Sequence, residues 1–91
     1  MDAQPVALEV VQDGGPTRIV VRGELDLVTA AWLERAVAEH LDADDDDIVV
    51  DLTRACVGDS TPIEVLMRAR TRAAGNGRRL DVVWQYWPLA S

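Results

Sequence analysis

Two short runs rich in β-branched residues begin the hydrophobic pattern of this chain. Residues 6–11 read VALEVV and residues 17–22 read TRIVVR, which is typical of β-strands. Between them lie residues 13–16 (DGGP), and glycine next to proline is typical of a turn. We expect the two runs to pair as an antiparallel hairpin.

The apolar spacing then changes to about 3.6 residues, the period of an α-helix. The first helical stripe comprises Ala30, Leu33, Val37 and Leu41. The second comprises Ile63, Leu66, Ala69 and Ala73. Thr29 is placed to cap the first helix, and residues 75–77 (GNG) end the second. The pattern therefore predicts two amphipathic helices.

Two further runs complete the expected sheet. Residues 48–52 (IVVDL) are apolar enough for a central strand covered on both faces, and residues 80–84 (LDVVW) predict a last strand. Residues 42–47 and 53–60 predict loops, the first because it is acidic. The order β-β-α-β-α-β predicts an α/β fold, a mixed four-stranded sheet with both helices on one face. We expect a single domain over residues 1–91, with its core at 6–84 and a short aromatic tail at 85–91.

The start of the second helix carries the most distinctive chemistry. Thr61 is followed by Pro62 and, three residues on, by Glu64, which satisfies the sequence rule for a capping box with Thr61 as the N-cap. A phosphate on Thr61, or on its neighbour Ser60, would lie at the positive end of the helix dipole. These hydroxyls therefore fit two roles, a helix cap and a phosphoacceptor.

Charge and hydropathy indicate which kinds of partner to expect. The net charge is −7, and thirteen of the sixteen acidic residues fall within residues 1–53. An acidic chain gains nothing from a phosphate backbone, so we expect no nucleic-acid binding. Since no apolar run approaches a membrane span and the N-terminus lacks the blocks of a signal peptide, we expect no membrane partner and a cytoplasmic location.

No pattern typical of catalysis or metal binding is present, so we expect no enzymatic activity, metal or cofactor. An EF-hand loop starting at Asp42 would need glycine at its sixth position and glutamate at its twelfth, and it has neither. Glu24 and Asp26 are more simply solvated or structural than an acid and base. His40 has no serine, lysine or second histidine at a compatible spacing, so it makes a poor catalytic base. The single Cys56 predicts a small buried side chain.

Three segments carry motifs of one known family. They are residues 21–26 (VRGELD) with Thr29 and Ala30 just after, residues 48–52 (IVVDL), and residues 57–61 (VGDST), which lead into a helix. In this combination the chain resembles the STAS domain of bacterial anti-sigma factor antagonists, over about residues 6–84. The resemblance implies a regulatory domain that acts by binding a partner.

The resemblance also implies a switch. In the family an aspartate precedes two small hydroxyl residues, of which the second is the usual phosphoacceptor, and these positions match Asp59, Ser60 and Thr61. The unphosphorylated protein binds an anti-sigma factor that is also a serine-protein kinase. Phosphorylation at Thr61, or at Ser60, releases that partner, and a phosphatase resets the switch. The implied partner-binding face comprises Glu24, Asp26, Asp59, Ser60, Thr61, Pro62 and Glu64.

Two departures from the family pattern leave alternatives open. The family glycine is here Pro62, which predicts an extended Thr61 and a stiffer start of the helix, so the protein could bind without being switched. The usual final helix and strand are lacking, so Trp84, Tyr86 and Trp87 could fold back over the sheet or join two copies as a homodimer. The alternative function is an unphosphorylated, STAS-like scaffold subunit of a lipid or solute transport assembly.

Overall fold

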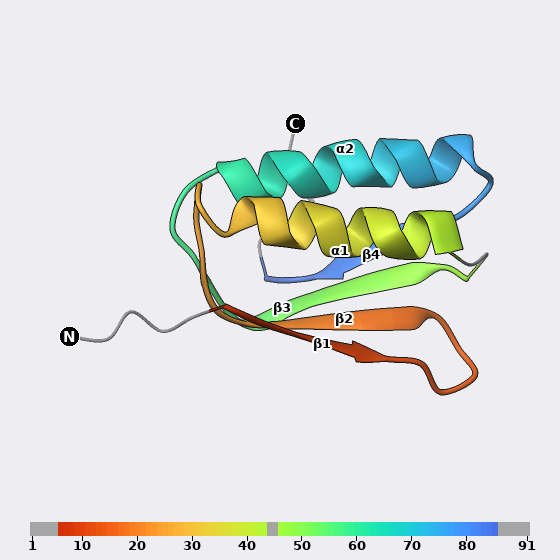
Figure 1. The fold of residues 1–91 in the computed structure, drawn as a ribbon, viewed down its shortest axis with the longest axis horizontal. Coiled ribbons are helices and arrows are strands. Elements are labelled where there is room, and N and C mark those ends of the chain that lie inside the picture. The colour runs from red at the N-terminus through yellow and green to blue at the C-terminus, as the bar shows by residue number, and fades with distance from the viewer. Residues whose placement is uncertain (1–5, 44–45, 86–91) are drawn as a thin grey trace.

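The computed structural model describes residues 6–43 and 46–85, which form four strands and two helices (Figure 1). The strands are β1 (Ala7–Val11), β2 (Thr17–Leu25), β3 (Ile48–Val57) and β4 (Leu80–Val83). The helices are α1 (Ala30–Ala43) and α2 (Thr61–Gly75). The predicted β-β-α-β-α-β order is therefore confirmed.

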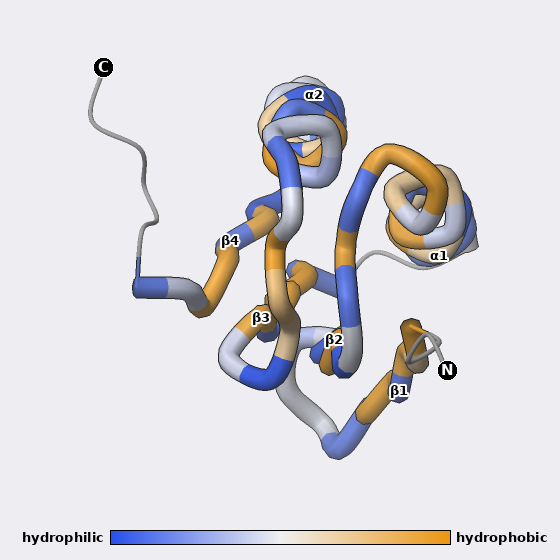
Figure 2. The backbone as a smooth tube through the Cα atoms, turned by 90° about the vertical axis from the view of Figure 1, so that its left-hand side faces the viewer, coloured by the Kyte–Doolittle hydropathy of each residue, from blue (hydrophilic) through white to orange (hydrophobic). Residues whose placement is uncertain are grey.

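The four strands form one mixed sheet in the order β1-β2-β3-β4. β1 pairs antiparallel with β2, as the hairpin pattern predicts, whereas β3 runs parallel to both of its neighbours. β3 therefore lies inside the sheet, in agreement with its apolar run. Both helices lie on the same side of the sheet (Figures 1 and 2), so the predicted α/β fold class is confirmed.

The core lies between this helix layer and the sheet. All four residues of the predicted α1 stripe are buried, and in α2 only Ala69 of the predicted stripe is partly exposed. They pack against sheet residues such as Ile19, Val21 and Val50, which are wholly shielded from solvent. Each such buried side chain contributes about 1.5–3 kcal/mol to the hydrophobic stabilisation.

β3 is longer than the pattern predicts. Residues 53–57, which we expected in a loop, continue the strand because β2 also continues and pairs with them, up to Leu25 opposite Val57. β4 ends opposite Asp51, so this part of β3 has a neighbouring strand on one side only. Cys56 lies in the extension and is exposed, so the prediction of a buried cysteine is wrong.

α1 is also longer than predicted. It continues through Asp42, which we expected in the acidic loop, to Ala43. The Asp42 carboxylate lies 2.7 Å from the guanidinium of Arg72 on α2, and this ion pair favours the extra helical residues. Asp46 and Asp47 are exposed and outside any helix or strand, as expected.

Candidate functional site

Two loops meet where β2 and β3 end and where both helices begin (Figure 1). We call this region, residues 24–29 and 58–64, the loop end. The backbone N–H of Gly58 donates to the carbonyl of Leu25 at 2.7 Å, which joins the ends of the two strands. The loop end contains every residue of the predicted partner-binding face.

The loop before α1 is held by its own side chains. The Asp26 carboxylate accepts the backbone N–H groups of Val28 at 2.9 Å and Thr29 at 3.1 Å. The Thr29 hydroxyl accepts the N–H of Asp26 at 2.9 Å and so bonds back into the loop. α1 begins directly after Thr29, as predicted, but the hydroxyl serves the loop.

Asp59 connects this loop to the start of α2. One carboxylate oxygen accepts the N–H of Thr61 at 2.9 Å, and the other accepts the N–H of Leu27, also at 2.9 Å. The bond from Thr61 lowers the pKa of Asp59 most, the bonds from Leu27 and the Thr61 hydroxyl add to it, and partial desolvation opposes them. Asp59 is therefore an ionised acceptor shared by two segments that are far apart in the sequence.

Ser60, and not Thr61, occupies the N-cap position of α2. Its backbone is helical, with φ −83° and ψ −10°, and its side chain makes no capping bond to the backbone. The Ser60 hydroxyl instead donates to Glu64 at 3.3 Å. The predicted capping box centred on Thr61 is wrong, because Asp59 satisfies the Thr61 N–H and lets the helix begin one residue earlier.

Pro62 and the two candidate phosphoacceptors differ in accessibility. The Pro62 side chain is fully buried, so it belongs to the core and offers nothing to a partner. Because α2 already includes Thr61, the prediction of an extended residue before the proline is also wrong. Ser60 is exposed and Thr61 is half-buried, so both hydroxyls lie at the surface.

Three exposed apolar side chains lie in the loop before α1 and in the first turn of that helix. Leu27 is 69% exposed, Val28 73% and Trp32, in the first turn of α1, 54%. Figure 2 shows that the segment between β2 and α1 forms a hydrophobic arch. We call Leu27 and Val28, which lie in this segment, the apolar turn. We call the apolar turn and Trp32 together the apolar patch. Exposed apolar clusters of this kind mark interaction sites on soluble proteins.

Sequence reasoning missed the apolar patch. The signal was present in part, because Trp32 lies off the stripe of Ala30, Leu33 and Val37 that predicts the buried face of α1. Leu27 and Val28 precede the helix, so its stripe says nothing about them. An apolar residue off the stripe has no place in the core. The connection between Asp59 and Leu27 left no local signal, because 32 residues separate the two in sequence.

The remaining predicted residues lie as follows. Glu24 is exposed at the end of β2, opposite Cys56 of β3. Trp84 is half-buried and packs against the core, as the folded-back alternative predicts. Tyr86 and Trp87 lie outside the described residues, so the homodimer stays a prediction.

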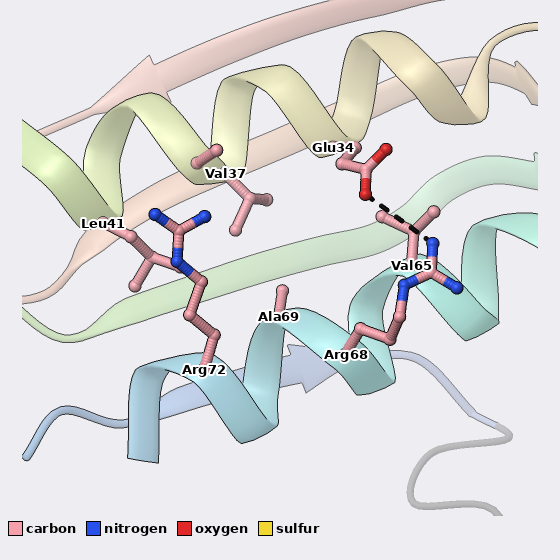
Figure 3. A pocket seen from close by; sticks show the side chains of 8 residues that line it. Glu34, Val37, Leu41, Val65, Arg68, Ala69 and Arg72 are labelled. Atoms are coloured by element: carbon pink, nitrogen blue, oxygen red, sulfur yellow. Dashed lines mark ion pairs between the residues drawn. The ribbon is translucent and has the colours of Figure 1, made fainter. Parts of the chain in front are cut away.

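A hollow between the two helices lies apart from the loop end. It is lined by apolar side chains such as Val37 and Val65, and an ion pair of 3.6 Å between Glu34 and Arg68 borders it (Figure 3). Its volume is about 90 Å³, whereas small-molecule sites usually measure about 300–1,000 Å³. The hollow is therefore too small to hold a metabolite.

The described residues form neither a cluster of metal ligands nor a membrane-spanning helix. Among the described residues, no three acidic, histidine or cysteine side chains gather closely enough to hold a metal ion. No helix in the described part of the chain has the length and apolar character needed to cross a membrane.

Comparison with known proteins gives one family and several similar folds. The family model described as "Mlab, STAS domain" matches residues 8–84. A crystal structure of an anti-sigma factor antagonist from Mycobacterium paratuberculosis has a TM-score of 0.72 and 26% identity, over 86% of this chain and 66% of that chain. This chain thus spans slightly less than two thirds of that relative. No curated protein matches.

Two other structures show the same fold at lower identity. The STAS domain of an antisigma-factor antagonist from Rhodobacter sphaeroides has a TM-score of 0.61 and 23% identity, over 87% of this chain and 84% of that chain. The crystal structure of Mglu has a TM-score of 0.67 and 18% identity, over 81% of this chain and 18% of that chain. In Mglu the shared fold is thus a small part of a larger chain.

Proposed function

Because this chain belongs to the STAS domain family, we propose that it is an anti-sigma factor antagonist that binds its partner through the loop end. The anti-sigma factor antagonist from Mycobacterium paratuberculosis, at 26% identity, supports this role. The observation that carries the proposal is the apolar patch beside Asp59, Ser60 and Thr61, since an exposed apolar cluster suits protein binding. Such a protein acts by binding in the cytoplasm and needs no catalytic group of its own.

The chemistry of the loop end defines the partner surface. The apolar patch would enter the dry centre of the interface, where a tryptophan such as Trp32 contributes most. The loop end contains four acidic residues, and no basic residue lies within residues 24–29 or 58–64. They are Glu24, Asp26, Asp59 and Glu64. We therefore expect the anti-sigma factor to present an apolar depression bordered by lysine or arginine, which would also speed association.

The proposed switch is a phosphoryl transfer to Thr61 catalysed by the partner, with Ser60 as the second acceptor. The hydroxyl oxygen attacks the γ-phosphorus of ATP, so one O–P bond forms and the bond from that phosphorus to the β–γ bridging oxygen breaks. ADP leaves, and a base of the kinase takes the hydroxyl proton. A phosphatase reverses the state by directing water onto the phosphorus, which yields the free hydroxyl and inorganic phosphate.

The added phosphate would weaken the interface without unfolding the domain. It carries a charge of about −1.5 to −2, which the N-terminus of α2 tolerates well. In the complex this charge would have to be desolvated beside four carboxylates and an apolar patch. An uncompensated buried charge costs several kcal/mol, so the affinity should fall by at least about 100-fold.

The proposal is tested by mixing the protein with its anti-sigma factor kinase, first without and then with ATP. We expect a stable complex by size-exclusion chromatography without ATP, and phosphothreonine at position 61 by mass spectrometry with ATP. The kinase is identified by pull-down from native cytoplasm with wild-type protein and Thr61→Glu in parallel. A kinase that neither binds nor phosphorylates the protein would refute the proposal.

Pro62 favours a second candidate, a STAS-like scaffold subunit of a lipid or solute transport assembly. The fully buried ring fixes the start of α2 where the family has glycine, which suits a protein that binds without being modified. Recovery of a transport ATPase in place of a kinase, equally with wild type and Thr61→Glu, would decide for this candidate.

A further inference from the structure

Asp59 is the side chain that joins the apolar turn to the candidate phosphoacceptor. We infer that Asp59 is a positioning residue that holds the apolar turn in place, and that a phosphate on Thr61 releases this turn. The inference rests on the proposed function for the modification of Thr61, whereas the connection through Asp59 is a property of the free protein.

The apolar turn has little else to hold it. The side chains of Leu27 and Val28 are 69% and 73% exposed, so packing fixes neither of them. Their backbone is held by two carboxylates, Asp26 on the Val28 N–H and Asp59 on the Leu27 N–H. Asp26 belongs to the same loop and would move with it. Asp59 therefore supplies the connection that fixes the turn relative to α2.

The same carboxylate is in direct contact with Thr61. It accepts the Thr61 N–H at 2.9 Å, and the Thr61 hydroxyl contributes slightly to lowering the pKa of this carboxylate. Phosphoryl transfer from ATP replaces the hydroxyl proton by a phosphoryl group of about −1.5 to −2 charge. A favourable bond to Asp59 thus becomes a repulsion between two anions. The carboxylate must turn away from Thr61, and the Leu27 N–H then loses its acceptor.

A second aspartate–threonine pair provides a matched control within the chain. Asp51 accepts the N–H of Thr53 at 2.9 Å, the same distance at which Asp59 accepts the N–H of Thr61, and it also accepts the Thr53 hydroxyl at 2.6 Å. Asp51 lies in β3, however, and none of its hydrogen bonds reaches the loop end. Asp51→Ala therefore removes the same local bonds without touching the apolar turn.

The test measures amide hydrogen exchange of Leu27 by NMR in the free protein. Phosphothreonine is placed at position 61 by ligation of a 1–55 thioester to a synthetic peptide that begins at Cys56, so no kinase is needed. We expect exchange at Leu27 to rise about fivefold to tenfold with Asp59→Ala and with phosphothreonine, as the loss of one hydrogen bond produces. Exchange at Val50, in the core, should stay unchanged and verify the fold.

Two controls separate charge from the loss of the hydroxyl bond. Thr61→Val, which removes the hydroxyl without adding charge, should change Leu27 exchange less than about twofold, and Asp51→Ala should leave it unchanged. Unchanged Leu27 exchange in Asp59→Ala or in the phosphothreonine protein would overturn the inference, as would an equal effect of Thr61→Val and phosphothreonine. If Leu27 responds as expected but no anti-sigma factor binds, the connection stands and the proposed function fails.

Discussion

At each end of the molecule one side chain bonds to segments that are far apart in sequence, but with opposite results. At the loop end, the exposed Asp59 accepts backbone N–H groups from two segments, and the apolar patch is exposed to solvent. At the other end, the guanidinium of Arg78 donates to the carbonyls of His40 and Leu41, at the end of α1, and of Asp46. We call residues 40–42, 46–48 and 78–80 the arginine end.

Among the described residues of the arginine end, no large apolar side chain is exposed. Leu41, Ile48 and Leu80 are all buried there, and the cation satisfies carbonyls at the negative end of the helix dipole. The bonds that Arg78 makes there stabilise the fold. At the loop end the connecting residue is accessible and the neighbouring apolar side chains are unused by the core, which suits recognition. Mutations at the two ends should therefore affect different measurements.

The largest expected effect concerns the arginine end. Arg78→Met should lower the free energy of unfolding by about 2–3 kcal/mol, because three carbonyls lose a charged donor. Urea denaturation measures this. Arg79→Met is the control, since among the described residues its exposed guanidinium pairs with Asp81 alone and should matter by less than about 1 kcal/mol. Equal losses of unfolding free energy in the two variants would show that the bonds of Arg78 to these carbonyls do not stabilise the fold.

Mutations in the apolar patch should weaken partner binding and leave the stability nearly unchanged. Trp32→Ala, or Leu27→Ser with Val28→Ser, should weaken partner binding by about 30-fold, since central apolar residues dominate interfaces. The free energy of unfolding should change by less than about 0.5 kcal/mol, because the side chains are exposed. Calorimetric titration and urea denaturation measure the two quantities. Met67→Ser, an exposed apolar residue on α2, is the binding control; a similar loss of affinity there would contradict the assignment of the face.

The expected effect of replacing Pro62 is smaller than the two above. Its ring supports the loop end from within the core. Pro62→Gly should cost about 1–2 kcal/mol of stability, through lost burial and a more flexible unfolded chain. It also restores the glycine that the family pattern implies. We expect faster phosphorylation of Thr61, measured as the initial rate with kinase and ATP. An unchanged rate would mean that the proline does not restrain the switch.

The smallest expected effect is a dependence on acid. Hydrogen bonds lower the pKa of Asp59 below its ordinary value of 3.8, so its stabilising contribution is complete above that value. The contribution is lost as the pH falls through the lower pKa of the folded protein. Wild type should therefore lose stability relative to Asp59→Asn below pH 3.8, measured by denaturation at several pH values. Parallel curves would show that the carboxylate is not held in the folded state.

The comparison of the two ends also shows what local patterns can predict. Element order and helix faces follow from periodicity, because each stripe has one face to bury, and the stripe of Ala30, Leu33, Val37 and Leu41 is buried as predicted. The burial of Cys56 was predicted wrongly because exposure of residues 53–57 depends on where β4 ends, a tertiary property. A run of sequence letters does not contain that information.

The sequence predicted which residues lie at the loop end, but not the hydrogen bonds that connect them. Motif resemblance placed Asp26, Asp59 and Thr61 together, and the loop end does bring them together. The N-cap was assigned one residue too late, because an aspartate two residues before Thr61 takes over its N–H. The bonds of Asp59 to Leu27 and of Arg78 to α1 join residues more than thirty positions apart, and local propensity does not encode such pairs.

The most direct test of the loop end as a switched binding surface is calorimetric titration of the anti-sigma factor with two proteins. One is the unmodified protein, and the other carries phosphothreonine at position 61, prepared by ligation at Cys56. The account predicts tight binding of the unmodified protein and an affinity at least about 100-fold lower for the phosphorylated one. Equal affinities would contradict it.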